Sequence, residues 1–244
     1  MGSVVILLYG IIAYLIAMAS VAYAIGFVGN YWVPKSIDSG PVGPLGEALV
    51  VNVLLLGLFA VQHSGMARRG FKKAWTVIVP EPVERSTYVL LSALILWLLY
   101  WQWRPITDEI WRVENPIGST LLQAVYFLGW GIVLLSTFLI SHFDLFGLKQ
   151  VFDHWLRKEA AAPEFKTPAL YKIVRHPIYL GFILAFWATP IMTLGHLLFA
   201  VATTGYILIG VFLEERDLVA TFGETYEAYR KRVSMLIPWP PPRS

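Results

Sequence analysis

The chain contains no cysteine, no evident repeat and few charged residues. Only 14% of its 244 residues are Asp, Glu, Lys or Arg, and the formal net charge is +3, whereas soluble domains carry about a quarter charged residues. The absence of cysteine excludes disulfide scaffolds, thiolate metal sites and cysteine nucleophiles. The small net charge argues against nucleic-acid binding. No histidine pair has the spacing His-x-x-x-His, so no metal site is expected.

Apolar residues are abundant instead, and they occur in long runs. They make up 57% of the chain. A spanning helix needs roughly 20 mostly apolar residues, because the hydrocarbon core of a bilayer is about 30 Å thick. These runs predict an integral membrane protein, and the first four of them each accommodate one transmembrane helix. The stretches without Asp, Glu, Lys or Arg are residues 1–34, 48–67, 86–103, 115–143 and 176–213.

The fifth run is too long for one crossing. Its 38 residues would extend about 57 Å as a single helix. Pro190 and Gly195 interrupt it, so we expect a helical hairpin at about 178–190 and 196–213. The first arm is short, and both a re-entrant and a fully spanning arm are compatible with its length. The predicted fold is therefore all-α: a polytopic membrane bundle of four clear transmembrane helices plus a C-terminal helical hairpin.

Loop charges predict the orientation, because Lys and Arg are retained on the cytoplasmic side. The loop after the second run and the segment 144–175 are rich in basic residues, whereas the loop after the third run carries Arg104 and Arg112 against three acids. This pattern places both termini, the 66–86 loop and the 144–175 segment in the cytoplasm. The family resemblance described below implies that this membrane is the inner membrane of a bacterium.

Two polar clusters flank the predicted hairpin. Arg175-His176-Pro177-Ile178-Tyr179 precedes it, and Glu214-Glu215-Arg216-Asp217 follows it. A hairpin returns its end to the face where it began, so the two clusters should be neighbours and form a polar site. Taken alone, however, the first cluster is also compatible with basic residues that simply lie at the membrane interface. The second is also compatible with the ordinary charged end of a spanning helix.

These clusters also carry a family resemblance. The order of motifs here resembles that of the isoprenylcysteine carboxyl methyltransferase and phospholipid methyltransferase superfamily. The motifs are Arg-His-Pro-x-Tyr-x-Gly, the hairpin, Glu-Glu, and then Phe222-Gly223-Glu224-x-Tyr226-x-x-Tyr229. The resemblance covers about residues 165–240. It implies that S-adenosylmethionine binds at the cytoplasmic face through this part of the chain. The cofactor contacts that it implies are Arg175, His176, Tyr179, Glu214, Glu215 and Tyr171.

Motifs in the N-terminal half of the chain indicate a particular family within this superfamily. Three segments resemble the bacterial methanethiol S-methyltransferases, and less closely the NnrU-like membrane proteins. They are Gln62-His63-Ser64-Gly65-Met66-Ala67-Arg68, Glu84-Arg85-Ser86-Thr87-Tyr88, and Ser141-His142-Phe143-Asp144 with the residues after it. This likeness implies methylation of methanethiol to dimethyl sulfide. It implies two parts, residues 1–156 forming the substrate side and residues 157–244 binding S-adenosylmethionine. The expected partners are a small thiol and the lipid bilayer, with no obligate protein partner.

Thiol methylation requires a thiolate, and a simple alkanethiol is mostly protonated near neutral pH. His142 and Asp144 are the best candidates for a base and its orienting carboxylate. Arg85 is placed to stabilise the thiolate, and His63 ends a neighbouring span on the same face. For the histidines, the competing interpretation is a helix cap or an interface hydrogen bond. For Arg85 it is a surface ion pair with Glu81 or Glu84.

Two other functions compete with thiol methylation. One is methylation of a lipid or of an isoprenylcysteine carboxyl group, which requires a lateral opening for a long chain. The other is a non-catalytic NnrU-like membrane protein or a small transporter. A transporter is expected to place ionisable residues near the bilayer midplane, and the uncharged runs contain no Asp, Glu, Lys or Arg.

Overall fold

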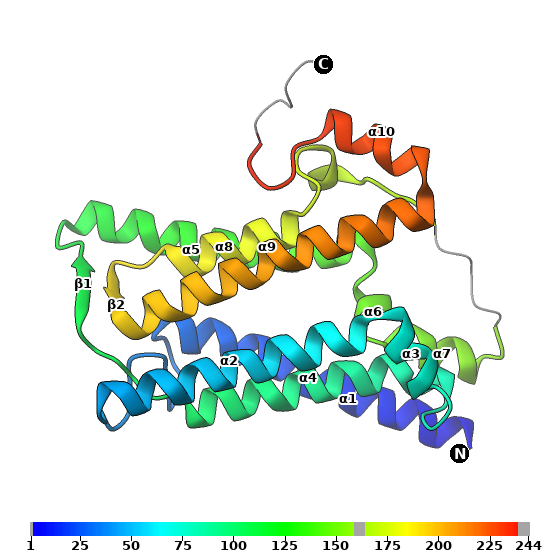
Figure 1. Cartoon of the computed structure of the whole chain (residues 1–244), viewed down its shortest axis with the longest axis horizontal. Helices are drawn as coiled ribbons and strands as arrows, with labels where there is room; N and C mark the ends of the chain where they lie inside the picture. The colour runs from blue at the N-terminus through cyan, green and yellow to red at the C-terminus, as the bar shows by residue number, and fades with distance from the viewer. Residues whose placement is uncertain (1, 159–163, 239–244) are drawn as a thin grey trace. The chain divides into compact units, whose positions relative to one another are not determined.

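The protein is a helical multi-pass membrane protein. The computed structural model describes residues 2–158 and 164–238 (Figure 1). Within these ranges, five helices are long and apolar enough to cross a membrane: α1 (Ser3–Gly29), α2 (Leu45–Ala67), α4 (Glu81–Gln102), α5 (Pro116–Ile140) and α9 (Leu194–Phe222). The predicted all-α membrane fold is thus confirmed. Residues 239–244 lie outside the described part, so the cytoplasmic C-terminus stays a prediction.

Shorter elements connect the spanning helices. The apolar helix α8 (Pro177–Trp187) is the first arm of the predicted hairpin, and α9 is the second. Two strands form a small sheet, β1 (Glu109–Arg112) with β2 (Ile191–Thr193). The remaining elements are α3 (Arg69–Trp75), α6 (His142–Leu145), α7 (Leu148–Trp155), the 3₁₀ helix η1 (Ala169–Lys172) and α10 (Glu224–Arg232).

The chain divides into two compact units. Unit 1 comprises Met1–Asp108, Ser141–Ala162 and Thr193–His196, and unit 2 comprises Glu109–Ile140, Pro163–Met192 and Leu197–Ser244. The sequence suggested a boundary after residue 156 instead. The structure differs because α5 packs against α8 and therefore groups with the C-terminal helices. The roles suggested for the two parts, substrate side and cofactor side, stay predictions.

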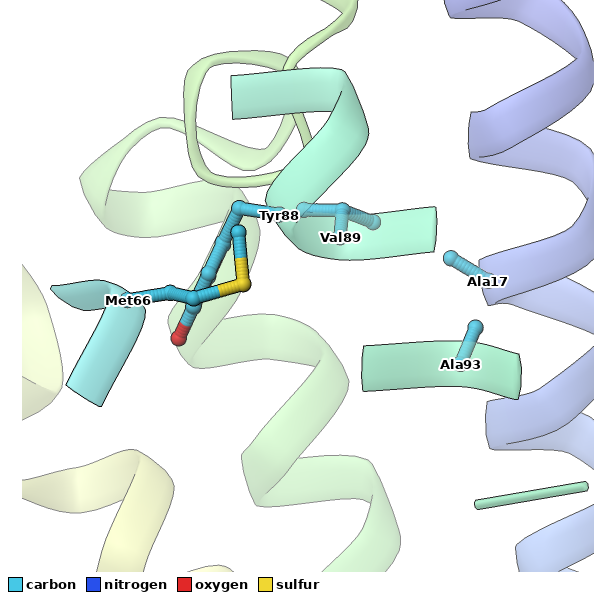
Figure 2. Packing of buried hydrophobic residues seen from close by; sticks show 5 residues of the cluster. All are labelled: Ala17, Met66, Tyr88, Val89 and Ala93. Atoms are coloured by element: carbon cyan, nitrogen blue, oxygen red, sulfur yellow. The ribbon is translucent and has the colours of Figure 1, made fainter. Parts of the chain in front are cut away.

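The core of unit 1 lies where α4 meets α1 and α2. Ala17 of α1 faces Ala93 of α4, and Tyr88 of α4 lies against Met66 of α2 (Figure 2). The small alanines allow α1 and α4 to approach closely, as is common between membrane helices. Large apolar side chains also cover the outer faces of the spans, for example Leu54, which is 67% exposed. That exposure suits contact with lipid rather than water.

In unit 2, α5 and α8 cross at two glycines. A Cβ atom added at Gly129 would lie 2.6 Å from the carbonyl oxygen of Gly181, and one added at Gly181 would lie 2.6 Å from the carbonyl oxygen of Gly129. No real Cβ fits at such distances, so this backbone contact requires glycine on both helices. It holds α8 along α5 (Figure 1). Phe186 of α8 in turn packs against Phe199 of α9, with ring centroids 5.0 Å apart.

Gly129→Ala is expected to lower the unfolding free energy by about 1–3 kcal/mol, the usual cost of overpacking. At Gly131 on the same helix, an added Cβ would meet no atom within 4 Å, so Gly131→Ala is the matched control and should leave stability unchanged. Thermal unfolding of the two variants in detergent measures the difference. Equal midpoints would mean that the α5–α8 contact is not tight.

The short arm of the hairpin continues after α8 as extended chain. The 11 residues of α8 rise only about 16 Å. Extended residues then continue to β2, where Val113 N donates to Pro190 O (2.8 Å) and Trp111 Nε1 donates to Thr189 O (3.2 Å). These partners satisfy the backbone outside the helix, as a membrane environment demands. The first arm therefore reaches the end of α5 that follows β1, and α9 returns from there.

Candidate active site

The two polar clusters that flank the hairpin meet in unit 2. Arg175, just before α8, binds Glu215 near the end of α9, with 2.6 Å between Nε and Oε1. Both side chains are largely buried, 11% and 9% exposed. The expected neighbourhood of the hairpin's entry and exit is thus confirmed across 40 positions of sequence. An ion pair this buried stabilises only when its remaining polar atoms are also satisfied.

His176 joins the same cluster. Its Nε2 lies 3.2 Å from Glu215 Oε1, and its Nδ1 lies 3.6 Å from Glu214 Oε2. Its ring stacks on Tyr179, one turn into α8, with centroids 5.6 Å apart. The adjacent acids differ in exposure, because neighbouring residues point about 100° apart on a helix. The Glu215 side chain is enclosed, whereas that of Glu214 is 45% exposed.

A C-terminal segment closes the cluster. Arg175 N donates to Ser234 O (2.8 Å), and Arg175 Nη1 donates to Arg230 O (3.1 Å) and to Val233 O. Arg230 Nε in turn lies 3.3 Å from Glu215 Oε2. Glu215 is therefore bound by three side chains. Arg230 was not among the site residues expected from the sequence, although it directly follows Tyr229 of the spaced motif.

Three tyrosines, Tyr171, Tyr226 and Tyr229, lie close to these charged side chains. Tyr171 donates its hydroxyl to Ser136 O (3.3 Å), and Tyr229 donates to Tyr171 O. Burial raises the pKa of Tyr171 and Tyr226 and raises that of Tyr229 to about 12, so all three stay neutral donors at physiological pH. Tyr226 is 1% exposed, and among the described residues its hydroxyl has no hydrogen-bond partner. A buried unpaired hydroxyl is costly, which makes Tyr226 a candidate ligand group.

In unit 1, His142 lies directly after α5 and begins α6. Its Nε2 is 2.9 Å from the hydroxyl of Tyr14 on α1, and aromatic rings of Phe143 and Phe146 pack against it. Burial lowers the pKa of His142, so the ring is neutral near pH 7 and competent to accept a proton. Nothing in the sequence pattern indicated Tyr14, which is 128 positions away.

Asp144 takes a different place from the one expected. Its side chain is exposed, and Oδ1 accepts a hydrogen bond from Gln150 Nε2 (2.7 Å). The Tyr14 hydroxyl, by contrast, lies 2.9 Å from Nε2 of His142. Asp144 and His142 occupy one helical turn, where residues two apart do not face each other, and this explains the difference.

Arg85 and His63 are linked through Tyr88. The Arg85 guanidinium lies 5.0 Å from the centre of the Tyr88 ring, and the Tyr88 hydroxyl lies 2.9 Å from His63 Nε2. Ser92 Oγ lies 3.2 Å from His63 Nδ1. Arg85, Tyr88 and Ser92 follow helical spacing on α4, so they share one face. Tyr88 and Ser92 were not among the site residues expected from the sequence, although their spacing from Arg85 is that of one helix face.

Arg85 also holds the turn that carries His142. Arg85 Nε donates to Leu145 O (2.9 Å), and Ser86 Oγ donates to Gly147 O (3.0 Å). Gly147 has φ +81°, and an added Cβ would lie 2.7 Å from Ser86 N, so the turn needs glycine. Glu84 is buried and pairs with Lys72 (3.0 Å). The four predicted catalytic residues thus lie in one connected region of unit 1, although the side chain of Asp144 is exposed.

Comparison with known proteins identifies the family. Methanethiol S-methyltransferase 1 of Bradyrhizobium diazoefficiens is 59% identical over 232 residues, which cover 95% of this chain and 81% of that protein. Methanethiol S-methyltransferase of Mycobacterium tuberculosis is 55% identical over 234 residues, 96% of each chain. The chain belongs to the methanethiol S-methyltransferase family. This membership confirms the resemblance found in the sequence and places the chain among methyltransferases.

More distant similarity extends beyond this family. Nurim of Danio rerio is 29% identical over 188 residues, which cover 72% of this chain and 66% of Nurim. No protein-family model matches the chain. No solved structure matches it either. The roles of individual residues in this methanethiol S-methyltransferase family member therefore rest on its own geometry.

Proposed function

We propose that this protein transfers a methyl group from S-adenosylmethionine to methanethiol, giving dimethyl sulfide, at the cytoplasmic face of the bacterial inner membrane. The observation that carries the proposal is the identity of 53% or more, over nearly the whole chain, with proteins named methanethiol S-methyltransferase. The basic loops support the cytoplasmic face, because Lys and Arg are retained on that side. The geometry of each unit then suggests which residues act.

The residues of unit 2 fit S-adenosylmethionine as the methyl donor. That molecule presents an amino-acid carboxylate, ribose hydroxyls, a flat adenine and a cationic sulfur. The exposed carboxylate of Glu214 suits hydroxyl or cationic groups, and Arg230, whose side chain is 44% exposed, suits a carboxylate. The stacked rings of His176 and Tyr179 suit the adenine, and the unpaired Tyr226 hydroxyl is a remaining polar partner.

We assign different roles to the adjacent acids Glu214 and Glu215. Glu215 organises the site, because Arg175, His176 and Arg230 already bind it. Glu214 is the acid we assign to the donor. A cavity of about 210 Å³ lies beside Glu215 and is lined in part by Phe212, Val219 and Arg230. It is smaller than the roughly 300 Å³ of typical ligand sites, so we place the donor against Glu214 and Tyr179 rather than within it.

The residues of unit 1 fit the activation of the thiol. When bound, S-adenosylmethionine supplies an electrophilic methyl group whose bond to the sulfonium breaks as the new carbon–sulfur bond forms. His142, whose Nε2 lies 2.9 Å from the Tyr14 hydroxyl, is the base to which we assign the thiol proton. The guanidinium of Arg85, fixed by Leu145 O and Tyr88, stabilises the thiolate. The imidazolium then returns its proton to solvent.

The decisive test is direct product detection. Purified protein in detergent or nanodiscs is incubated with methyl-labelled S-adenosylmethionine and methanethiol in sealed vials, and the headspace is assayed for labelled dimethyl sulfide. We expect one labelled methyl group per product molecule and none when either reactant is omitted. A protein that retains its thermal unfolding transition but releases no labelled dimethyl sulfide would contradict the proposed function.

A further inference from the structure

Unit 1 contains a charged cavity, and Arg85 is the one residue of its lining that the methyl-transfer proposal uses. Its volume is about 630 Å³, and it lies between α3, the residues after it and the start of α4. Six charged side chains line it: Arg69, Lys72, Lys73, Glu81, Glu84 and Arg85. Basic groups outnumber acids, and one of the acids, Glu84, is buried and neutralised by Lys72 at 3.0 Å. The lining is therefore positive and complementary to an anion.

The position of this cavity along the chain sets it at a membrane boundary. The helix α3 begins two residues after the spanning helix α2 ends, and the spanning helix α4 begins at Glu81. The connecting segment exposes large apolar side chains beside its lysines, with Phe71 at 40%, Val77 at 84% and Ile78 at 79%. Basic residues interleaved with exposed apolar ones are typical of segments that lie in the headgroup region.

We propose that this cavity, which we call the α3–α4 cavity, binds the phosphate of an anionic phospholipid of the inner leaflet. Basic pockets between spanning helices on the cytoplasmic side suit lipid headgroups. A free phosphate offers the same charge, but it leaves Phe71, Val77 and Ile78 exposed to water. A lipid covers these apolar side chains with its acyl chains while its headgroup enters the cavity. The charge and the apolar exposure together favour the lipid.

The occupied cavity connects to the turn that carries His142. Gln150 of α7 also lines it, and Arg85 contributes to it while donating Nε to Leu145 O. A headgroup bound here neutralises part of the charge around Arg85. Because the binding residues tested below, Arg69 and Lys73, lie outside the proposed methyl-transfer machinery, lipid binding can be lost without loss of the chemistry.

The test compares spin-labelled phosphatidylglycerol with spin-labelled phosphatidylcholine around the full-length protein in vesicles of phosphatidylcholine. Electron paramagnetic resonance gives the relative association constant of the two lipids for the protein surface. We expect a clear preference for phosphatidylglycerol in the wild type. Arg69→Gln and Lys73→Gln should each reduce that preference about five-fold, and Glu81→Gln, which removes an acid from the lining, should increase it.

Controls separate this cavity from general surface charge and from free anions. Lys172→Gln and Lys231→Gln remove exposed basic residues elsewhere and should change the preference much less than Arg69→Gln and Lys73→Gln do. An unchanged preference in Arg69→Gln and Lys73→Gln would overturn the proposal. So would cancellation of the preference by inorganic phosphate, but not by chloride of equal ionic strength, since this would identify a site for soluble anions.

Discussion

Arg175→Met is expected to abolish methyl transfer and to weaken binding of S-adenosylmethionine by at least about 100-fold. The substitution leaves Glu215 enclosed without its closest partner, and breaking a buried ion pair costs about 3–5 kcal/mol of unfolding free energy. It also releases the bonds from Arg175 Nη1 to Arg230 O and Val233 O. Titration calorimetry and thermal unfolding measure the two effects. Arg232→Met, an exposed charge loss on α10, is the matched control.

A repaired variant separates binding from folding. In Arg175→Met/Glu215→Leu both buried charges are gone, and apolar replacement of a buried pair is often neutral for stability. We therefore expect this double variant to recover much of its thermal stability while donor binding stays lost. Recovery of donor binding together with stability would show that the ion cluster only supports the fold and does not form the donor site.

His142→Ala is expected to lower turnover by about 10²–10⁴-fold, the usual contribution of a general base, without changing the affinity for S-adenosylmethionine. Burial lowers the pKa of His142, so its neutral, proton-accepting form persists below the ordinary histidine value of about 6.5. The wild-type rate should therefore fall only as the pH drops below that value. In His142→Ala this acid limb should disappear, and the rate should rise toward alkaline pH, where the thiol ionises by itself.

The matched control is His154→Ala, which removes a histidine of α7 outside the proposed site. We expect wild-type kinetics and the same acid limb in this variant. Tyr14→Phe should keep His142 in place but remove the hydroxyl that holds its Nε2, so an intermediate loss of turnover is expected. Full activity of His142→Ala at neutral pH would eliminate His142 as the proton acceptor.

The parts of the fold that are built from long segments without charged residues were predictable from the sequence. The spanning helices and the hairpin could be read because Lys, Arg, Asp and Glu are excluded from the hydrocarbon core. The contact between Arg175 and Glu215 followed from the same pattern, since a hairpin returns its exit to the face of its entry. Topology alone was sufficient for these predictions.

Features that depend on packing between distant segments could not be read. Nothing in the sequence pattern indicated that Gly129 meets Gly181, and so α5 was grouped with the N-terminal helices. The Tyr14 hydroxyl beside His142 comes from a helix 128 positions away. Arg230 comes from α10, the next helix after the one that carries Glu215, but no spacing rule indicated that α10 folds back onto Glu215. The spacing of His142 and Asp144 suggested a pair, but short spacing within one helical turn does not bring two side chains face to face.

The central claim is that the donor nucleoside lies where the residues before α8 meet the end of α9. A photoreactive 8-azidoadenosyl analogue of S-adenosylmethionine, irradiated with the purified protein and followed by peptide mapping, measures this position directly. The account predicts labelling within residues 171–181 or 212–230 that excess S-adenosylhomocysteine prevents. Labelling that S-adenosylhomocysteine prevents but that is confined to the peptides of α2 and α4 would contradict it.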